Sequence, residues 1–374
     1  MRARIGSEGR LVLTLLLVPL GVLFVFVLVL LVISPGRPSS IVDERGRPVV
    51  GSISEKIRVT INGAEQGMFI RGRDETKPVL LFVHGGAGMP EYFLAQKYPT
   101  ALKVLEDHFI VCWWERRGAG LSYSTKLLPQ SITVEQMVSD LLAVTDYLRD
   151  RFHEDKIYLM AHSGGTFFAL QAVARSPQSY HAYIAVAQIA GQLKSENVAY
   201  QYMLKRFREI GDGGMVRRLE SAPPTMSVPL PASYMAIRDK AMHSLGVGTT
   251  RQMRSVIAGV FLPSWLSPDY TVMEKVNIWR GKAFSDGLLW NKILATDLAT
   301  TVTSVAIPVY FLHGIHDYTV TLPETKAYFE RLKAPVKGFY TFPGSAHSPM
   351  FEEPERIRQI LEQDVFEGTN SLAD

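Results

Sequence analysis

Hydrophobic and polar residues form two alternating kinds of pattern in the first half of the chain. Continuous apolar runs, typical of strands buried on both faces of a sheet, alternate with segments whose apolar residues recur at helical spacing. The pattern predicts strands over residues 57–61, 79–83, 109–114, 156–160 and 183–187, and helices over residues 133–152 and 166–175. Strands and helices that alternate in this way predict a parallel sheet with helices on both faces.

The alternation stops near Ala190 and resumes at residues 307–312. The residues between are helical or irregular in pattern, with Pro223, Pro224, Pro229 and Pro231 among them and no convincing strand. One α/β domain interrupted by a mostly helical insertion is the simplest account. We therefore expect a separate N-terminal segment (1–34), a linker (35–54), the first part of the α/β domain (55–190), a helical cap (191–300) and the second part of the domain (301–374).

The N-terminal segment is the most hydrophobic part of the chain. Leu11 to Ile33 contains no charged residue. A helix of this length spans about 34 Å at about 1.5 Å per residue, against a bilayer core of roughly 30 Å. A cleaved signal peptide would be shorter and end in small residues, whereas this run ends in Val32-Ile33-Ser34-Pro35. A buried core helix would rarely be apolar all round. The segment is therefore predicted to be a single-pass membrane anchor.

The charges that flank this segment give only a slight bias in orientation. Three arginines precede the apolar run and three follow it, and the chain's own amino group adds to the first set. Because cytoplasmic flanks are enriched in positive charge, the amino terminus is expected inside the cell. The large domain would then lie outside the cytoplasm.

Composition and charge exclude several classes of function. Hydrophobic residues make up 47% of the chain and charged residues 20%, as in a globular protein with a substantial core. The net charge of +4 and the lack of a basic run argue against nucleic-acid binding. The single cysteine, Cys112, lies within an apolar run and is expected to be a core residue. No ligand cluster with suitable spacing implies a metal, and no organic cofactor is implied.

A serine between small residues follows the predicted strand at 156–160. The segment Ala161-His162-Ser163-Gly164-Gly165 then leads into a predicted helix. Such a strand–turn–helix is sharp and strained, so that bulky neighbours would clash, and it exposes the serine hydroxyl at the end of the sheet. The N–H of Gly164 would face an incoming carbonyl oxygen. A Gly/Ser turn without chemical meaning is the alternative.

A serine hydroxyl is a weak nucleophile unless a base lies beside it. In this kind of fold the order along the chain is nucleophile, acid, histidine. His347 lies in a turn segment after a short apolar stretch, and Asp317 follows the strand expected at 307–312. Ser163, Asp317 and His347 are thus predicted to form a catalytic triad. A turn-capping Asp317 and a surface loop His347 are the alternatives.

A glycine-rich segment follows the predicted strand at 79–83. In His84-Gly85-Gly86-Ala87-Gly88, the backbone N–H of Gly86 is the expected second donor of an oxyanion hole, beside that of Gly164. Glycine-rich loops also cradle phosphate, but neither of the usual phosphate-binding spacings follows here.

These motifs together resemble the α/β-hydrolase superfamily, and more narrowly its branch of proline iminopeptidases and related aminopeptidases. That branch typically has H-G-G-P-G where this chain has residues 84–88, and D-Q-R-G-x-G-x-S near residues 114–122. The resemblance covers roughly residues 57–190 and 301–365. This sequence departs from the pattern at Ala87, which replaces a proline, and at Glu115, which replaces an aspartate. It also departs in the turn that carries the serine, residues 161–165, which we call the elbow and which reads A-H-S-G-G.

The resemblance implies an α/β-hydrolase fold with a helical cap. It also implies that acidic cap residues hold the free amine of the substrate. Glu196 is the candidate for this role, with Glu209 or Glu220 as alternatives, and each is equally compatible with a solvated helix position. The residues around Arg117 are expected to shape the loop beneath the site.

The function expected from these observations is hydrolysis of an ester or amide through an acyl-enzyme on Ser163. An aminopeptidase of the proline iminopeptidase type and a carboxylesterase or lipase-like enzyme both fit, with a small ester, amide or short peptide as the substrate. A catalytically silent binding module, or a lyase or transferase, also stays open. An epoxide hydrolase or dehalogenase is disfavoured, because those relatives have aspartate at the position of Ser163. The sequence does not indicate the oligomeric state.

Overall fold

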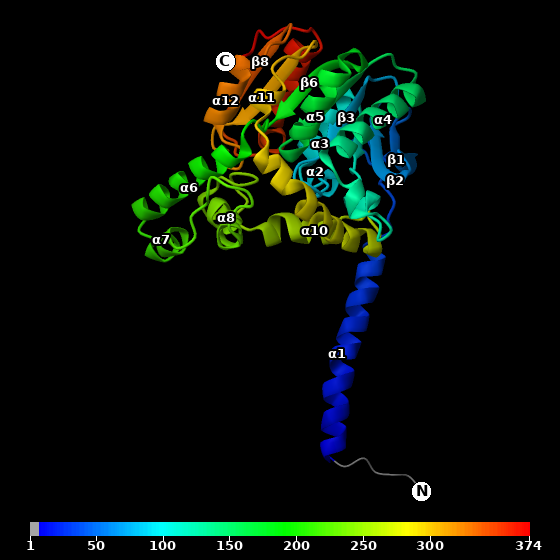
Figure 1. Cartoon of the computed structure of the whole chain (residues 1–374). Helices are drawn as coiled ribbons and strands as arrows, with labels where there is room; N and C mark the ends of the chain where they lie inside the picture. Colours follow the sequence, from blue (N-terminus) through cyan, green and yellow to red (C-terminus); the bar gives the residue numbers. More distant parts are fainter. Residues whose placement is uncertain (1–6) are drawn as a thin grey trace.

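A single eight-stranded sheet forms the centre of the molecule (Figure 1). In the computed structural model, which describes residues 7–374 without the side chains of residues 7–16, 19, 23 and 26, the strand order is β1-β2-β4-β3-β5-β6-β7-β8. The strands are β1 (Ile53–Ile61), β2 (Ala64–Gly72), β3 (Val79–Val83), β4 (Ile110–Trp114), β5 (Ile157–His162), β6 (Tyr180–Val186), β7 (Val309–Gly314) and β8 (Lys337–Phe342). Only the pairs β1–β2 and β2–β4 are antiparallel. The predicted mostly parallel sheet is confirmed.

Helices cover both faces of the sheet because its central strands are apolar on both sides. Leu81 belongs to a core shared with α4 (Val134–Phe152) and α5 (Gly164–Arg175), while its neighbour Leu80 belongs to a core on the opposite face. The helices of the segments outside the cap are α2 (Tyr92–Ala95), α3 (Pro99–His108), α4, α5, α12 (Leu322–Arg331), α13 (Pro349–Glu352) and α14 (Pro354–Ile360). Alternating burial along each strand therefore places two apolar layers around one sheet.

The residues between β6 and β7 are helical and lie over the edge of the sheet where β3, β5 and β7 end (Figure 1). They form α6 (Gln192–Glu209), α7 (Gly213–Glu220), α8 (Ala232–Leu245), the short π-helix η4 (Ile257–Phe261), α9 (Leu262–Leu266), α10 (Val272–Ala295) and α11 (Leu298–Thr301). We call residues 191–300 the cap. Helices α6, α7 and α8 contribute to a separate apolar core, so this part of the cap is packed against itself.

Helix α1 (Ser7–Val32) projects away from the rest of the molecule (Figure 1). Its end is held to the cap, where the N–H of Gly36 donates to the carbonyl of Pro268 at 3.0 Å. The predicted anchor, residues 1–34, lies in part outside the described residues. Within the part of the chain that is described, no helix is found that is long and apolar enough to cross a membrane.

One strand of the sheet was not expected from the sequence, and β8 was anticipated only as the short apolar stretch before His347. Strand β2 contains Gln66 and Gly67 and shows no clear alternation of apolar and polar residues. Gln66 is nevertheless fully buried, because its amide donates to Asp140 on α4 at 2.8 Å and its carbonyl accepts from the indole of Trp114 at 2.9 Å. A strand whose buried polar side chains form hydrogen bonds in this way cannot be recognised from its hydrophobic pattern.

Candidate active site

Ser163 lies at a strained turn between β5 and α5. Its φ of 50° and ψ of −124° fall in a region that residues other than glycine rarely adopt. Such a conformation costs about 1–3 kcal/mol and persists only where the surrounding structure holds it. The N–H of Ser163 donates to Val186 on the neighbouring strand at 2.9 Å, which fixes the turn against the sheet.

The two glycines that follow are required by close backbone packing. A Cβ on Gly164 would lie 2.5 Å from the carbonyl oxygen of Gly86, and one on Gly165 would lie 2.4 Å from that of Val83. Both distances are far below van der Waals contact, so any side chain here would push α5 away from the loop after β3. The small residues of the elbow are thus explained by contacts with the glycine-rich segment.

Asp317 and His347 form a buried hydrogen-bonded pair at the ends of β7 and β8. The Nδ1 atom of His347 donates to Oδ2 of Asp317 at 2.8 Å. The other oxygen, Oδ1, accepts from the backbone N–H of Thr319 at 2.8 Å and of Val320 at 3.0 Å. Because Nδ1 faces the carboxylate, Nε2 is the ring nitrogen left to act as a base.

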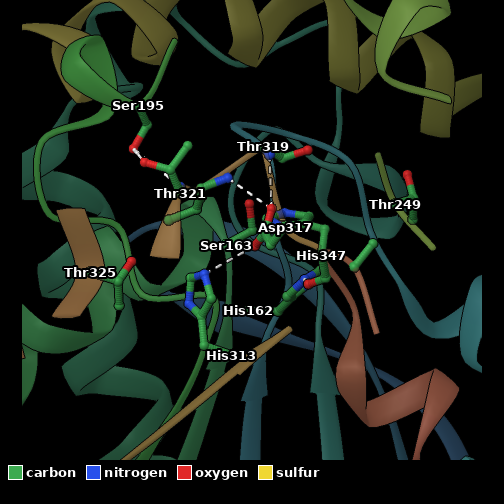
Figure 2. A network of polar contacts seen from close by, with 12 residues as sticks. His162, Ser163, Ser195, Thr249, His313, Asp317, Thr319, Thr321, Thr325 and His347 are labelled. Carbon is green, nitrogen blue, oxygen red and sulfur yellow. Dashed lines mark hydrogen bonds and ion pairs between the residues drawn. The ribbon is translucent and has the colours of Figure 1, made fainter. Parts of the chain in front are cut away.

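Ser163 and His347 line the same cavity, which has a volume of about 210 Å³. Figure 2 shows Ser163, Asp317 and His347 gathered beside His162. Among the hydrogen bonds of the described residues, none joins the Ser163 hydroxyl to the imidazole of His347. In hydrolases without bound substrate this bond is often loose and tightens only in the reacting complex.

Burial and charge act in opposite directions on this pair. Burial alone would raise the pKa of Asp317, but the neighbouring His347 lowers it below its usual value. Burial also lowers the pKa of His347, and the partly compensating attraction of Asp317 does not restore it. The pair therefore rests as a carboxylate with a neutral imidazole, which is the form that accepts a proton from a serine hydroxyl.

The glycine-rich loop is oriented by the buried guanidinium of Arg116. Its Nη2 atom donates to the carbonyl of Gly85 at 3.2 Å and to that of Gly86 at 2.7 Å. In a trans peptide the N–H points opposite to the preceding carbonyl, so holding the Gly85 carbonyl on one side turns the Gly86 N–H to the other. Gly86 lines the cavity, and Gly164, as the first residue of α5, has no intrahelical acceptor for its N–H. Both predicted donors thus lie beside Ser163.

A second buried acid–imidazole pair borders Ser163. The Nδ1 atom of His162 lies 2.6 Å from Oε1 of Glu91, and its Nε2 lies 2.9 Å from the carbonyl of His347. Since a carbonyl can only accept, Nε2 carries a proton. Burial alone would lower the pKa of His162, but Glu91 raises it above its usual value. This pair was not foreseen from the sequence, although His162 stands inside the elbow motif.

Glu196 does not support the role expected for it. The residue is fully buried, and Arg238 donates to both carboxylate oxygens, from Nε at 2.6 Å and from Nη2 at 2.7 Å. The hydroxyl of Tyr234 and the amide of Gln192 add a bond each, both at 3.0 Å. No acceptor capacity is left for a substrate amine, so the prediction of Glu196 as the amine-binding residue is corrected.

The two alternatives in the cap are also placed away from the cavity. Glu209 pairs with Arg206, and Glu220 pairs with Arg208 at 2.7 Å, in both cases between exposed side chains. Neither glutamate is among the residues that line the cavity around Ser163. Both are solvated helix residues.

The remaining walls of the cavity are largely apolar. They are formed by Met89, Pro90, Phe93, Leu94, Val260 and Trp290. The polar wall residues are Glu91, His162, Ser163, Arg238, Thr249, Thr319 and His347. Across the described side chains, no group of three or more His, Cys, Asp or Glu residues is arranged to hold a metal ion.

Sequence and structure comparisons agree with this architecture. Residues 74–354 match the family model described as serine aminopeptidase, S33. The probable aminopeptidase YbaC of Bacillus subtilis (strain 168) is 30% identical over 320 residues, which cover 84% of this chain and 97% of that protein. The fold and the match define a serine hydrolase of the α/β-hydrolase fold. The chain belongs to the S33 serine aminopeptidase family, which confirms the resemblance inferred from the motifs.

Two solved structures illustrate the likeness in fold. A proline iminopeptidase-related protein from Thermus thermophilus has a TM-score of 0.57 at 21% identity, over 83% of this chain and 96% of that chain. A membrane phospholipase A described as a bacterial virulence factor has a TM-score of 0.56 at 17% identity, over 97% of this chain and 99% of that chain. At these identities the comparison shows a shared fold alone.

Proposed function

We propose that the protein is an aminopeptidase that removes an N-terminal residue from a short peptide or related amide through an acyl-enzyme on Ser163. Family membership supports the serine hydrolase class, and the similarity to YbaC supports the aminopeptidase assignment. The observation that carries the proposal is the buried bond of 2.8 Å between His347 and Asp317, set beside a serine in a strained turn.

Each residue of the site has a defined part in this reaction. His347 takes the proton of the Ser163 hydroxyl as its oxygen attacks the scissile carbonyl, and the N–H groups of Gly86 and Gly164 stabilise the oxyanion. The protonated His347 then gives its proton to the leaving amine. Water attacks the acyl-enzyme by the same route, which releases the N-terminal residue with a free carboxylate and restores Ser163. Asp317 stabilises the imidazolium throughout.

A covalent probe tests the nucleophile, and paired substrates test the reaction class. A fluorophosphonate is expected to label the wild-type protein and not the Ser163→Ala variant. Hydrolysis of alanyl and prolyl arylamides should exceed that of their N-acetylated forms. Absence of labelling would support a silent binding module, and labelling with esterase activity alone would support a carboxylesterase.

The esterase alternative has one observation in its favour. The cavity wall includes the apolar side chains of Met89, Phe93 and Trp290, which suit a hydrophobic acyl group. A p-nitrophenyl ester series of increasing acyl length measures this directly. A kcat/KM that rises with acyl length and exceeds that for every arylamide would favour the esterase.

The proposal includes attachment to a membrane through α1. Residues 11–33 are uncharged over their whole length, as a membrane-spanning segment requires. Where side chains are described, α1 exposes large apolar groups, with Phe24 at 64%. Apolar residues of η4 and α9 in the cap are also exposed, including Ile257 at 67% and Leu266 at 62%, and α9 ends close to Pro268, which contacts Gly36. Exposed apolar surface of this extent favours contact with lipid.

Fractionation of cells that express the full chain tests this part of the proposal. The protein should stay with the membranes after extraction at alkaline pH, and protease added outside intact spheroplasts should digest the domain that follows α1. Recovery of the full chain in the supernatant would contradict membrane attachment. Protection from the protease would contradict the orientation alone.

A further inference from the structure

The carboxylate of Glu91 has one oxygen in use and one free. Oε1 lies 2.6 Å from Nδ1 of His162. Oε2 is buried and has no hydrogen-bond partner among the described residues, although Glu91 as a whole is only 8% exposed. Buried carboxylate oxygens normally accept a hydrogen bond, because burying one without a donor is costly. The carboxylate of Glu91 is therefore incompletely satisfied by the protein and can accept a further donor.

Glu91 borders the cavity of the nucleophile. Among the described residues that line this cavity, it contributes the single carboxylate. A Cβ built on Gly85 would lie 2.9 Å from Oε1 of Glu91 and 3.1 Å from Cβ of Ser163. The carboxylate and the nucleophile therefore adjoin the same small volume.

The chemistry of an aminopeptidase requires an acceptor in this volume. The α-amino nitrogen of the substrate is two bonds from the carbonyl carbon that Ser163 attacks, so the two atoms lie only about 2.5 Å apart. A carboxylate that recognises the amine must then lie within a few ångströms of Ser163. Glu91 meets this requirement. Glu196 does not, because Arg238 occupies both of its oxygens.

The charges around Glu91 keep its free oxygen available. His162 uses both ring nitrogens, one toward Glu91 and one toward the carbonyl of His347, so it cannot turn to cover Oε2. Arg116 donates through Nη2 to the carbonyls of Gly85 and Gly86, and its Nε and Nη1 have no partner among the described residues, Glu91 included. Neither cation closes the carboxylate off, in contrast to the bidentate contact of Arg238 with Glu196.

We propose that the carboxylate of Glu91 binds the α-ammonium group of the substrate's N-terminal residue, with His162 as the residue that positions the carboxylate. This inference rests on the aminopeptidase function proposed above and identifies its specificity residue. It assigns recognition of the amine to the loop after β3 rather than to the acidic residues of the cap.

The test compares the wild-type full chain with Glu91→Gln, which keeps the shape of the side chain and removes its charge. The first readout is the ratio of kcat/KM for an alanyl arylamide to that for its N-acetylated form. An ammonium–carboxylate hydrogen bond is worth about 1.5–3 kcal/mol, so the ratio should fall by at least about tenfold. Glu106→Gln is the matched control, because Glu106 is equally buried but pairs with Arg71 away from the cavity. That control should leave the ratio unchanged.

A second readout does not depend on peptidase activity. L-Alaninamide should competitively inhibit hydrolysis of a p-nitrophenyl ester by the wild type, N-acetyl-L-alaninamide should not, and Glu91→Gln should abolish the inhibition. Inhibition by the free amine without arylamide cleavage would overturn the proposed peptidase function and keep the amine site. Equal inhibition by both amides, no inhibition at all, or inhibition that persists in Glu91→Gln would overturn the role of Glu91.

Discussion

The active-site cavity at the end of the sheet, here called the rim, and the cap each contain a buried carboxylate beside a basic side chain: Glu91 with His162, and Glu196 with Arg238. The two carboxylates differ in how many of their hydrogen bonds are formed. In the cap, Glu196 receives donors on both oxygens from Arg238, and Tyr234 and Gln192 add two more bonds. At the rim, Glu91 has one oxygen without a partner among the described residues. Both oxygens of Glu196 are therefore fully used, whereas Oε2 of Glu91 is enclosed without a donor among the described residues.

This difference separates a structural role from a chemical one. A buried ion pair whose hydrogen bonds are complete contributes little beyond holding its own neighbourhood, and breaking it leaves a bare charge. A buried acceptor left open costs stability until a ligand completes it. Substitutions at the rim should therefore change rates with little effect on stability, and substitutions in the cap pair should do the reverse.

The largest effect is expected from Ser163→Ala. Loss of the nucleophile should reduce kcat by about 10⁶-fold, because His347 and Asp317 cannot act without it. The midpoint of urea unfolding should stay close to that of the wild type, since no bond of the Ser163 hydroxyl is found among the described residues. Measured turnover above a thousandth of the wild-type rate would place the nucleophile elsewhere.

The next effect in size is expected from Asp317→Asn. An amide in place of the carboxylate can hold His347 in the wrong tautomer and no longer stabilises the imidazolium, and in serine hydrolases such a change lowers kcat by about 10⁴-fold. Single-turnover kinetics with a p-nitrophenyl ester would measure the loss in the acylation step. A loss confined to KM would show that Asp317 serves binding rather than proton transfer.

The cap pair should show the opposite behaviour. Glu196→Gln leaves the buried guanidinium of Arg238 with only the exposed Asp239 as its counter-ion, at 2.8 Å, which should lower the free energy of unfolding by about 3 kcal/mol. Glu209→Gln, an exposed position on the same helix, should change it by no more than about 1 kcal/mol. Urea unfolding of both variants provides the measurement. An intact stability in Glu196→Gln, with a lost preference for free amines, would return recognition of the amine to the cap.

Much of the fold could be predicted because its strands are continuous apolar runs. Val79 to Val83 is identical in extent to the predicted strand, and the strand predicted at 109–114 differs from β4 by one residue. Strand β2 escaped prediction because Gln66 is polar yet satisfied by Asp140 and Trp114. The hydrophobic pattern of a sequence therefore reveals a buried strand only where the buried side chains are apolar.

Some residues of the candidate site could likewise be predicted from the sequence, and others could not. Ser163, Asp317 and His347 could be selected because each follows a strand of a parallel sheet, so that their order along the chain fixes a common edge. The partner of Glu196 could not be foreseen, because Arg238 lies on a different helix of the cap and its contact depends on how α6 and α8 pack. The contacts of Glu91 and Arg116 were hidden for the same reason, although Arg116 stands inside the recognised motif at 114–122 and Glu91 lies three residues after the one at 84–88.

The smallest effect concerns pH and compares the two imidazoles at the rim. His347 must be neutral to accept the proton of Ser163, so kcat/KM should fall as the pH drops through its pKa. Because burial lowers that pKa and Asp317 only partly opposes the shift, the acid limb should be centred below 6.5. The pKa of His162 is raised instead, so a limb centred above 6.5 would report His162 and contradict the assignment of the base. An ester without ionisable groups should be the substrate, since an α-amine with a pKa of about 8 would add a transition of its own.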